Sequence, residues 1–162
     1  MEIERKFRVI DLPQNLDQYA KKEIKQGYLC NGPIVRIRQS NDLYYLTYKN
    51  RKGISQEHAI QSHEVELELT EEAFWHLVEK VDGNIIEKTR YLIPLNEKLT
   101  IELDVFEGKL KGLFFAEVEF ASEEEAKLFI KPDWFGEEVS FDKRYRNSYL
   151  SEVDSFADLG II

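Results

Sequence analysis

Charged side chains occupy every second position in several short stretches of this sequence. The chain begins MEIERKF, in which Glu2, Glu4 and Lys6 share one parity and the apolar Ile3 and Phe7 share the other. Because a β-strand turns alternate side chains to opposite faces, this stretch would present two carboxylates and an ammonium on one face. Clustered carboxylates bind hard divalent cations, and cationic side chains bind phosphate oxygens, so phosphoryl-transfer chemistry is indicated.

The same alternation recurs in six further stretches, and in each the alternating face carries charges of one sign. The basic residues on these faces are Arg36, Arg38, Lys49, Lys88 and Arg90. The acidic residues are Glu64, Glu66, Glu68, Glu102, Asp104, Glu117 and Glu119. Like charges two positions apart repel each other, so each stretch needs counter-charge from elsewhere.

Two interpretations of these faces are open at this level. In an ordinary antiparallel sheet, the charged face of each strand points to water and the apolar face packs on the core. Alternatively, the sheet closes into a barrel with its charged faces inward, where a polyanion and a divalent metal supply the counter-charges. Segregation of the signs by strand favours the barrel, but the sequence does not say which strands are neighbours.

Eight alternating segments form the predicted strands. They cover residues 2–9, 24–30, 33–40, 43–50, 58–69, 84–94, 98–106 and 112–120. Short turn sequences separate several of them, which indicates an antiparallel meander rather than βαβ units.

Three helices are expected beside these strands. The first covers residues 71–81 with Thr70 as its N-cap, and the second covers 123–130 with Ser122 as its N-cap. A third helix is expected to start near Asp142.

Length and composition limit the classes of function. With 162 residues, the chain is most simply one domain over residues 1–162. Its net charge of −9 disfavours broad binding to nucleic acids, and it lacks the apolar run of about 18 residues that a membrane span needs. The single cysteine, Cys30, fits a reducing compartment. We therefore expect a cytoplasmic protein without nucleic-acid or membrane partners.

With these motifs in view, the chain resembles the CYTH family of triphosphate tunnel metalloenzymes, whose hallmark is ExExK near the N-terminus. Within the family it is most similar to the small bacterial members that hydrolyse inorganic tripolyphosphate. The matching motifs are Glu2-Ile-Glu4-Arg-Lys6, QGYL at 26–29, VRIR at 35–38, LTYK at 46–49, EKTRY at 87–91, ELDVF at 102–106, EVEF at 117–120 and WFGEEVSFDKRYRN at 134–147. The resemblance implies an α+β fold: an eight-stranded antiparallel closed β-barrel that forms a tunnel, with a charged interior and helices packed outside.

The resemblance also implies roles for individual residues. The expected metal ligands are Glu2, Glu4, Glu64, Glu66, Asp104, Glu117 and Glu119. The expected substrate-binding residues are Lys6, Tyr28, Arg36, Arg38, Lys49, Lys88, Arg90, Lys143 and Arg144. The expected catalytic residues are Lys6, Lys88, Arg90, Glu117 and Glu119.

Some of these roles have alternatives. Glu64 and Glu66 could instead orient the arginines, and Tyr28 could simply pack. Lys143 and Arg144 are expected on the C-terminal helix at one tunnel mouth. Arg51 and Lys52, in a segment that does not match the family cleanly, either reach the substrate or lie on a hairpin turn.

The expected activity is metal-dependent hydrolysis of inorganic tripolyphosphate with Mg²⁺ or Mn²⁺. The alternatives are a nucleoside or thiamine triphosphatase, a class IV-type adenylyl cyclase, and a noncatalytic module that binds polyphosphate. The many carboxylates argue against pure anion binding. The sequence identifies neither the general base nor the preferred triphosphate, and a homodimer is compatible with it.

Overall fold

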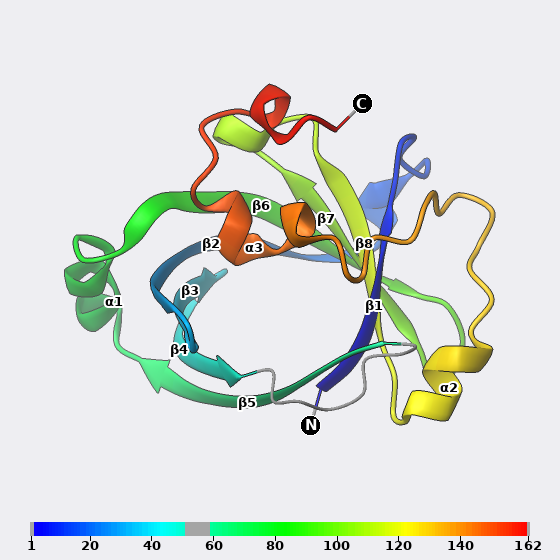
Figure 1. Cartoon of the computed structure of the whole chain (residues 1–162), viewed down its shortest axis with the longest axis horizontal. Helices are drawn as coiled ribbons and strands as arrows, with labels where there is room; N and C mark the ends of the chain where they lie inside the picture. The colour runs from blue at the N-terminus through cyan, green and yellow to red at the C-terminus, as the bar shows by residue number, and fades with distance from the viewer. Residues whose placement is uncertain (1, 51–58, 162) are drawn as a thin grey trace.

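The computed structural model describes residues 2–50 and 59–161, and within these ranges eight antiparallel strands close into a barrel (Figure 1). The strands are β1 (Glu2–Arg8), β2 (Ala20–Asn31), β3 (Ile34–Ser40), β4 (Leu43–Asn50), β5 (Ile60–Leu69), β6 (Asp82–Pro94), β7 (Thr100–Phe106) and β8 (Phe114–Glu119). Their order around the barrel is β1-β5-β4-β3-β2-β6-β7-β8. The expected barrel is confirmed. Arg51 and Lys52 lie outside the described residues.

Closure of the barrel depends on β1. Strands β2 to β5 form a meander of antiparallel neighbours, whereas β1 pairs with β5 on one side and with β8 on the other. Glu4 thereby lies opposite both Ile60 and Glu119. Pairing between segments so distant in sequence removes both free edges of the sheet.

The register of the strands puts the charged faces inside. Lys6 lies opposite Glu117, and Arg90 lies opposite Asp104. On the outer face of β1, Phe7 is buried, only 1% exposed. Because side chains alternate along each strand, this register turns the charged faces inward, together with Phe106 and Phe115, which share the faces of Asp104 and Glu117.

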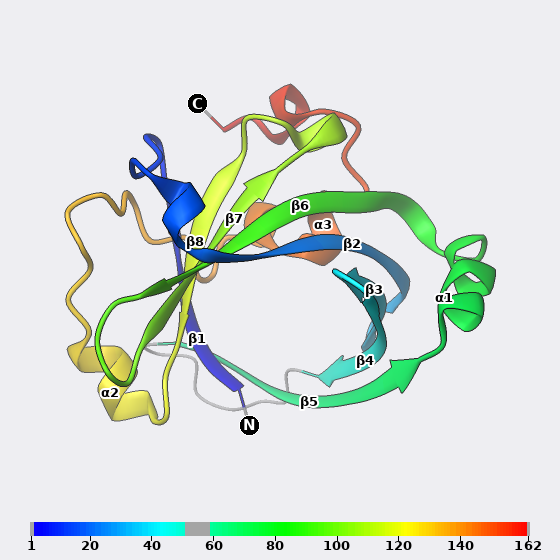
Figure 2. The same cartoon turned by 180° about the vertical axis from the view of Figure 1, so that it is seen from behind.

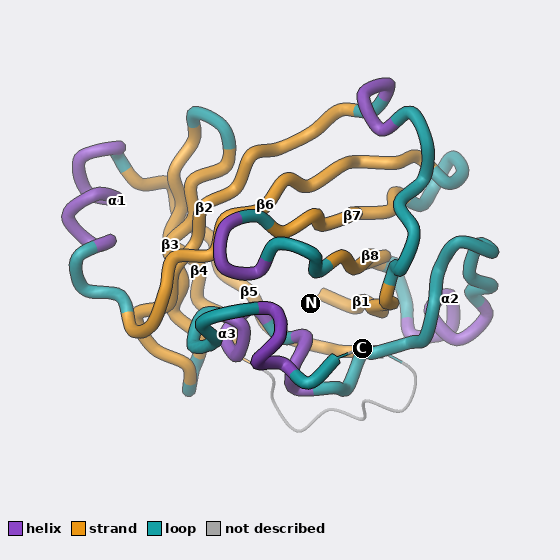
Figure 3. Tube along the Cα trace, turned by 90° about the horizontal axis from the view of Figure 1, so that it is seen from above, coloured by secondary structure: helices purple, strands orange, loops and turns teal. Residues whose placement is uncertain are grey.

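Helices cover parts of this apolar outer surface. The α-helices are α1 (Glu71–Val78), α2 (Glu123–Leu128) and α3 (Asn147–Leu150), and the 3₁₀ turns are η1 (Leu16–Gln18), η2 (Gly108–Leu110), η3 (Lys143–Tyr145) and η4 (Phe156–Leu159). Seen from above, α1 and α2 lie at opposite sides of the barrel (Figure 3). Coverage is incomplete, since Val65 and Leu67 on β5 are 56% and 58% exposed.

The N-caps are as predicted, but two helix ends are not. Thr70 Oγ1 accepts a hydrogen bond from Ala73 N, and Ser122 Oγ accepts one from Glu125 N, each at 3.1 Å. The first helix ends at Val78 rather than at residue 81, since pairing of the next segment with β2 begins at residue 82. The second ends at Leu128 rather than at residue 130.

The extended backbone of Phe129 (φ −64°, ψ 129°) ends α2. That conformation directs the Phe129 ring toward Phe7 and Phe120, with centroids 6.0 and 5.2 Å away. The prediction of one helix starting near Asp142 was also wrong. Arg146 is extended (φ −76°, ψ 132°) and separates η3 from α3.

Two hydrophobic clusters stabilise the barrel, one on its outer face and one that closes its end next to α3. The first lies on the outer face of β1, β7 and β8 and includes Phe120, Ala126 and Phe135. The second, which we call the end cluster, contains Tyr28, Ile86, Phe106, Leu110, Leu113, Phe115, Val139, Tyr145, Leu150 and Leu159. It brings α3 against one end of the barrel (Figure 1), while strands form the rim of the opposite end (Figure 2).

In the described part of the chain, the longest helix is α1, with 8 residues. A membrane span needs about 20 predominantly apolar residues. No described helix is therefore able to cross a bilayer.

The burial of α3 leads to a stability prediction. Leu150 is 0% exposed in the end cluster, so Leu150→Ala should lower the free energy of unfolding by about 2–5 kcal/mol in urea denaturation. The matched control is Leu128→Ala at the end of α2, where the side chain is 69% exposed. We expect that change to stay within about 0.5 kcal/mol. Equal losses in the two variants would contradict the assigned role of the end cluster.

Candidate active site

The charged faces of the strands line one tunnel through the barrel. Near α3 it forms a cavity of about 90 Å³ that is lined by Glu2, Glu4, Lys6, Tyr28, Ile34, Arg36, Arg38, Lys49, Glu64, Arg90, Glu102, Glu117, Arg146, Asn147 and Ser148. Toward the opposite mouth it widens to about 530 Å³ and is lined in addition by Lys22, Ile24, Ser40, Asn41, Asp42, Leu43, Tyr45, Glu66 and Glu119. The two parts share Glu2, Arg36, Arg38, Glu64, Arg90 and Glu102, so they form one continuous space.

A buried ion network makes up one wall of the tunnel. Asp104, which is 0% exposed, accepts hydrogen bonds from Lys88 Nζ at 2.7 Å and from Arg90 Nε and Nη2 at 2.7 and 3.0 Å. Arg90 Nη1 also donates to Glu102 at 3.0 Å. Burial acts to raise the pKa of Asp104, but Arg90 and Lys88 outweigh it and lower that pKa. The geometry places Asp104 as the anchor of two cations, although the resemblance implied a metal ligand.

Lys88 is the most enclosed cation of the site. Its side chain is 0% exposed, and Nζ donates to Asn147 Oδ1 at 3.1 Å as well as to Asp104. Nζ also lies 5.4 Å from the centroid of the Phe106 ring. Burial lowers the pKa of Lys88 to about 7, against an attraction from Asp104 that raises it. Lys88 can therefore exchange a proton near neutral pH.

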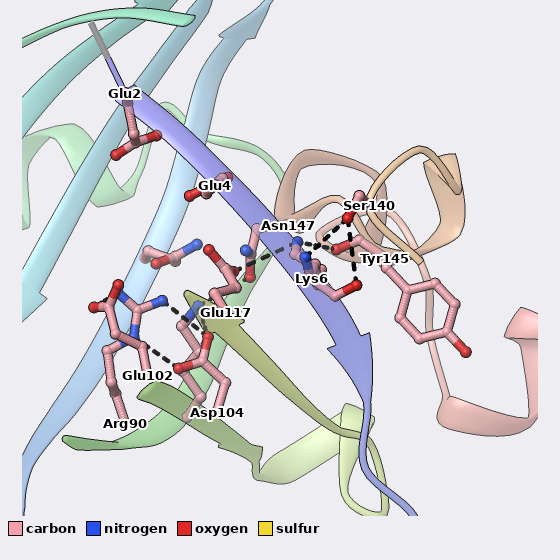
Figure 4. Close-up of polar contacts among 12 residues, drawn as sticks. Glu2, Glu4, Lys6, Arg90, Glu102, Asp104, Glu117, Ser140, Tyr145 and Asn147 are labelled. Atoms are coloured by element: carbon pink, nitrogen blue, oxygen red, sulfur yellow. Dashed lines mark hydrogen bonds and ion pairs between the residues drawn. The ribbon is translucent and has the colours of Figure 1, made fainter. Parts of the chain in front are cut away.

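Lys6 lies at the same end of the tunnel, where it contacts the segment that leads into α3 (Figure 4). Its Nζ donates to the carbonyl oxygen of Tyr145 at 2.7 Å and lies 3.5 Å from Glu117 Oε1. The ammonium also lies 4.4 Å from the centroid of the Phe115 ring. Its backbone N–H donates to Ser140 Oγ at 2.9 Å. The C-terminal segment thus positions Lys6 through both its backbone and its side chain.

Carboxylates crowd the adjoining wall, along β1 and β8, since β8 pairs with β7. Glu4 lies opposite Glu119, and its neighbours along the tunnel are Glu2 and Glu117 (Figure 4). Burial, reinforced by the charge of Glu117, raises the pKa of Glu4 to about 8. Burial and the charge of Glu2 likewise raise the pKa of Glu119. This wall carries more negative charge than nearby side chains neutralise.

Two carboxylates of this wall, Glu2 and Glu117, have cationic side chains close by. Lys49 Nζ forms an ion pair with Glu2 and lies 4.0 Å from Glu4 Oε1. Burial acts to raise the pKa of Glu117, but the neighbouring cations, Lys6 first, outweigh it and hold that pKa well below its ordinary value. Glu4 and Glu119 are therefore the carboxyl groups of this wall whose ionised forms the protein compensates least.

The arginines of β3 form the third group. Arg36 Nη2 donates to Thr47 Oγ1 at 3.1 Å and lies 3.7 Å from Glu64 Oε1. Arg38 Nε donates to Gln26 Oε1 at 2.9 Å. Burial, followed by repulsion from Arg36, lowers the pKa of Arg38. The contact with Glu64 fits the alternative in which that residue orients an arginine.

Of the remaining expected residues, two line the tunnel and two lie outside its lining. Tyr28 is 3% exposed and lines the tunnel, and its hydroxyl accepts a hydrogen bond from Gln26 Nε2 at 3.1 Å. Glu66 lines only the wide mouth. Lys143 is exposed, and Arg144 forms an ion pair with Asp142 at 2.8 Å. The structure therefore places Lys143 and Arg144 outside the tunnel lining.

Sequence reasoning gave no role to five residues that line the cavity near α3, namely Ile34, Glu102, Arg146, Asn147 and Ser148. Arg146 and Asn147 end the DKRYRN segment and Ser148 follows it, and the break at Arg146 directs this part of the chain to the tunnel. Asp142 was the available signal: an acidic N-cap two residues before Arg144 can pair with that arginine and keep it on the surface.

A metal would have to be held by few protein ligands. Within residues 2–50 and 59–161, no three His, Cys, Asp or Glu side chains converge as a complete metal site. Mg²⁺ typically binds through one or two carboxylates together with water and substrate phosphates. The uncompensated carboxylates of β1 and β8 fit that requirement, because a cation beside Glu4 would relieve the repulsion that raises its pKa.

Comparisons with known proteins agree with this architecture. The family model described as CYTH domain matches residues 1–157. A protein of Nitrosomonas europaea named inorganic triphosphatase is 41% identical over 154 residues, which is 93% of this chain and 96% of that protein. One of Acetivibrio thermocellus with the same name is 40% identical, with 92% of each chain covered. A crystal structure of an inorganic triphosphatase matches with a TM-score of 0.69 and 37% identity, over 96% of this chain and 97% of that one.

The raised pKa of Glu4 predicts a pH dependence of stability. Between its ordinary value of 4.5 and about 8, the folded protein keeps a proton on Glu4 that the unfolded chain has released. This contribution to the free energy of unfolding therefore falls as the pH rises through that window.

Glu4→Gln should remove this loss, because glutamine is neutral at every pH. Above pH 8 the variant should be more stable than the unsubstituted chain by up to about 5 kcal/mol, since one pKa unit corresponds to about 1.4 kcal/mol. Below pH 4.5 the two should converge. Urea denaturation across this range measures the difference, and a ¹³C NMR titration that found the Glu4 carboxyl at its ordinary pKa would refute the explanation.

Proposed function

The chain belongs to the CYTH domain family, and on this premise we propose that it hydrolyses inorganic tripolyphosphate to pyrophosphate and phosphate. Relatives that are 41% and 40% identical over more than nine-tenths of the chain are named inorganic triphosphatase. The structural observation that carries the proposal is the tunnel itself, where cationic side chains and an excess of carboxylates face each other across one enclosed space.

A linear triphosphate suits the shape and the charge of this tunnel. The basic side chains on several strands can contact successive phosphate groups, and those that line the tunnel are Lys6, Arg36, Arg38, Lys49 and Arg90. Lys88 is buried outside this lining and donates to Asp104. Guanidinium groups form paired hydrogen bonds to phosphate oxygens, and ammonium groups act as point charges.

Mg²⁺ or Mn²⁺ is the proposed cofactor. Hard oxygen ligands select these ions over zinc, and one or two of the carboxylates of Glu2, Glu4, Glu117 and Glu119 would hold the ion, together with water and phosphate oxygens. A bound ion would supply positive charge for the phosphate oxygens and would lower the pKa of a coordinated water. Glu64 and Glu66 lie toward the wide mouth and are proposed to orient arginines or to contribute an additional ligand.

Other residues of this chain are proposed to stabilise charge and to transfer a proton. Arg90 and Lys88, anchored by Asp104, stabilise negative charge that develops on the phosphate oxygens. Lys6, held by the Tyr145 carbonyl, does so at the end next to α3. Glu4, whose pKa of about 8 keeps it protonated near neutral pH, is able to donate a proton there.

Tripolyphosphate is the proposed small-molecule partner, and a cytoplasmic location is proposed on the basis of the single cysteine. No observation favours the nucleoside or thiamine triphosphatase, or the adenylyl cyclase. The noncatalytic alternative is disfavoured by the unneutralised carboxylates, which would weaken simple anion binding.

Phosphate release tests the proposal. Tripolyphosphate, pyrophosphate, ATP and thiamine triphosphate should be compared with each metal, and we expect tripolyphosphate to be hydrolysed fastest. Lys6→Ala and Glu117→Ala should each lower this rate by at least about 100-fold, since each removes a charge from the reacting centre. Lys80→Ala and Glu79→Ala, exposed and just after α1, are the charge-matched controls. Binding of tripolyphosphate without release, with either metal, would establish the noncatalytic alternative instead.

Removal of the metal is a separate test. EDTA should stop phosphate release, and an excess of Mg²⁺ or Mn²⁺ should restore it. Glu119→Gln should raise the Mg²⁺ concentration for half-maximal rate by about 10-fold or more, because one carboxylate ligand is lost. Full activity in EDTA, after dialysis against a metal-free buffer, would contradict the proposed role of the carboxylates.

A further inference from the structure

The arginines of the tunnel differ in how many of their N–H groups already donate hydrogen bonds within the protein. Those that line the cavity near α3, among the described residues, are Arg36, Arg38, Arg90 and Arg146. Arg38 directs its Nε–H to Gln26, and Arg90 directs its Nε–H and one Nη–H to Asp104. The Nε–H edge of both guanidinium groups is therefore occupied.

Arg36 and Arg146 each have their Nε–H available, although Nη2 of Arg36 donates to Thr47. In both, Nε is buried and finds no hydrogen-bond partner among residues 2–50 and 59–161. A buried N–H without an acceptor costs free energy, so such a group in a native structure needs an explanation. A guanidinium uses a planar pair of N–H groups to bind a phosphate in a bidentate manner. Both arginines face the same cavity, which fits an anion as the missing acceptor.

The position of Arg146 is determined by its two neighbours in the chain. The Tyr145 carbonyl accepts a hydrogen bond from Lys6 Nζ at 2.7 Å, and Asn147 Oδ1 accepts one from Lys88 Nζ at 3.1 Å (Figure 4). The Tyr145 ring is buried in the end cluster, 1% exposed. The segment is thus attached to two of the buried lysines, and Arg146 lies between the points of attachment.

Arg144, two residues earlier, is used differently. Its Nε and Nη2 donate to Asp142 at 3.2 and 2.8 Å, and its Nη1 donates to the carbonyl of Gly160 at 3.4 Å. Its side chain is 43% exposed. Arg144 therefore joins η3 to the C-terminal tail, and its Nε–H edge is not available to a ligand.

We propose that Arg146 binds the phosphate group of tripolyphosphate that lies next to α3, together with Arg36. This inference rests on the proposed function and adds a residue to its binding site. Arg146 takes the place that the resemblance gave to Lys143 and Arg144. Because the residue belongs to the segment that leads into α3, substrate binding also links α3 to the strands of the barrel.

Binding without turnover is the direct test. Isothermal titration of the unsubstituted chain and its variants with an imido analogue of tripolyphosphate, in the presence of Mg²⁺, measures affinity separately from hydrolysis. Arg146→Ala should weaken binding by about 10- to 100-fold, the cost of losing a charge-assisted bidentate contact. Arg146→Lys, which keeps the charge but not the planar pair, should fall between the two. Lys111→Ala, exposed on the surface after η2, is the charge-matched control and should bind normally.

Steady-state kinetics separate this role from a structural one. The affinity loss should appear in Arg146→Ala mainly as a higher KM for tripolyphosphate, with an unchanged melting temperature. Equal affinity of Arg146→Ala and the unsubstituted chain would overturn the inference and leave the proposed function intact. If the unsubstituted chain binds the analogue normally but releases no phosphate from tripolyphosphate, the proposed function is overturned. The comparison of affinities in the titration still decides the role of Arg146. Absence of binding by the unsubstituted chain would overturn both.

Discussion

Charged side chains inside a closed barrel must be neutralised by counter-charges rather than by bulk water. The arrangement of the tunnel walls depends on this constraint. Asp104 meets it on one wall, where a single fully buried carboxylate binds Lys88 and both donors on one edge of Arg90. Removing one partner from a buried ion network typically costs about 3–5 kcal/mol. On the adjoining wall, burial and the charge of Glu117 raise the pKa of Glu4, which lacks an equivalent set of cations. Nearby carboxylates therefore neutralise the cations of the β6–β7 wall more fully than nearby cations neutralise the carboxylates of the β1–β8 wall.

This imbalance explains how structure and chemistry are connected. A wall with excess carboxylates attracts a divalent cation, and the cations opposite keep enough free donors for a polyanion. Arg36 and Arg146 are the clearest examples, since a buried Nε–H in each has no acceptor among the described residues. The bound groups would thus neutralise the protein in the places where it does not neutralise itself.

A polar interior also changes where the hydrophobic core can lie. The apolar faces of β1, β7 and β8 pack under α2 and the segment after it, where Phe7, Phe129 and Phe135 contact one another. The end cluster packs α3 against the barrel and gives Lys6 and Lys88 an aromatic floor in Phe115 and Phe106. Stability comes from these two clusters, which leaves the tunnel free to carry charges that a core would exclude.

Local rules in the sequence determined much of this protein. The alternation of Glu2, Glu4 and Lys6 places them on one face of any strand, and the N-caps at Thr70 and Ser122 depend only on residues within one turn. Helix ends were less predictable, because pairing of β6 with β2 and packing of Phe129 both involve distant partners.

Only the tertiary structure decided which face is inside and which charges meet. Glu4 meets Glu119, and Lys6 meets Glu117, because the barrel closes between the first strand and the last, a pairing between opposite ends of the chain. The choice of Arg146 over Arg144 likewise depends on contacts of its neighbours with Lys6 and Lys88. The physical reason is the same in each case: the sequence specifies side-chain direction along one strand or turn, whereas contact requires the register between segments far apart in the chain.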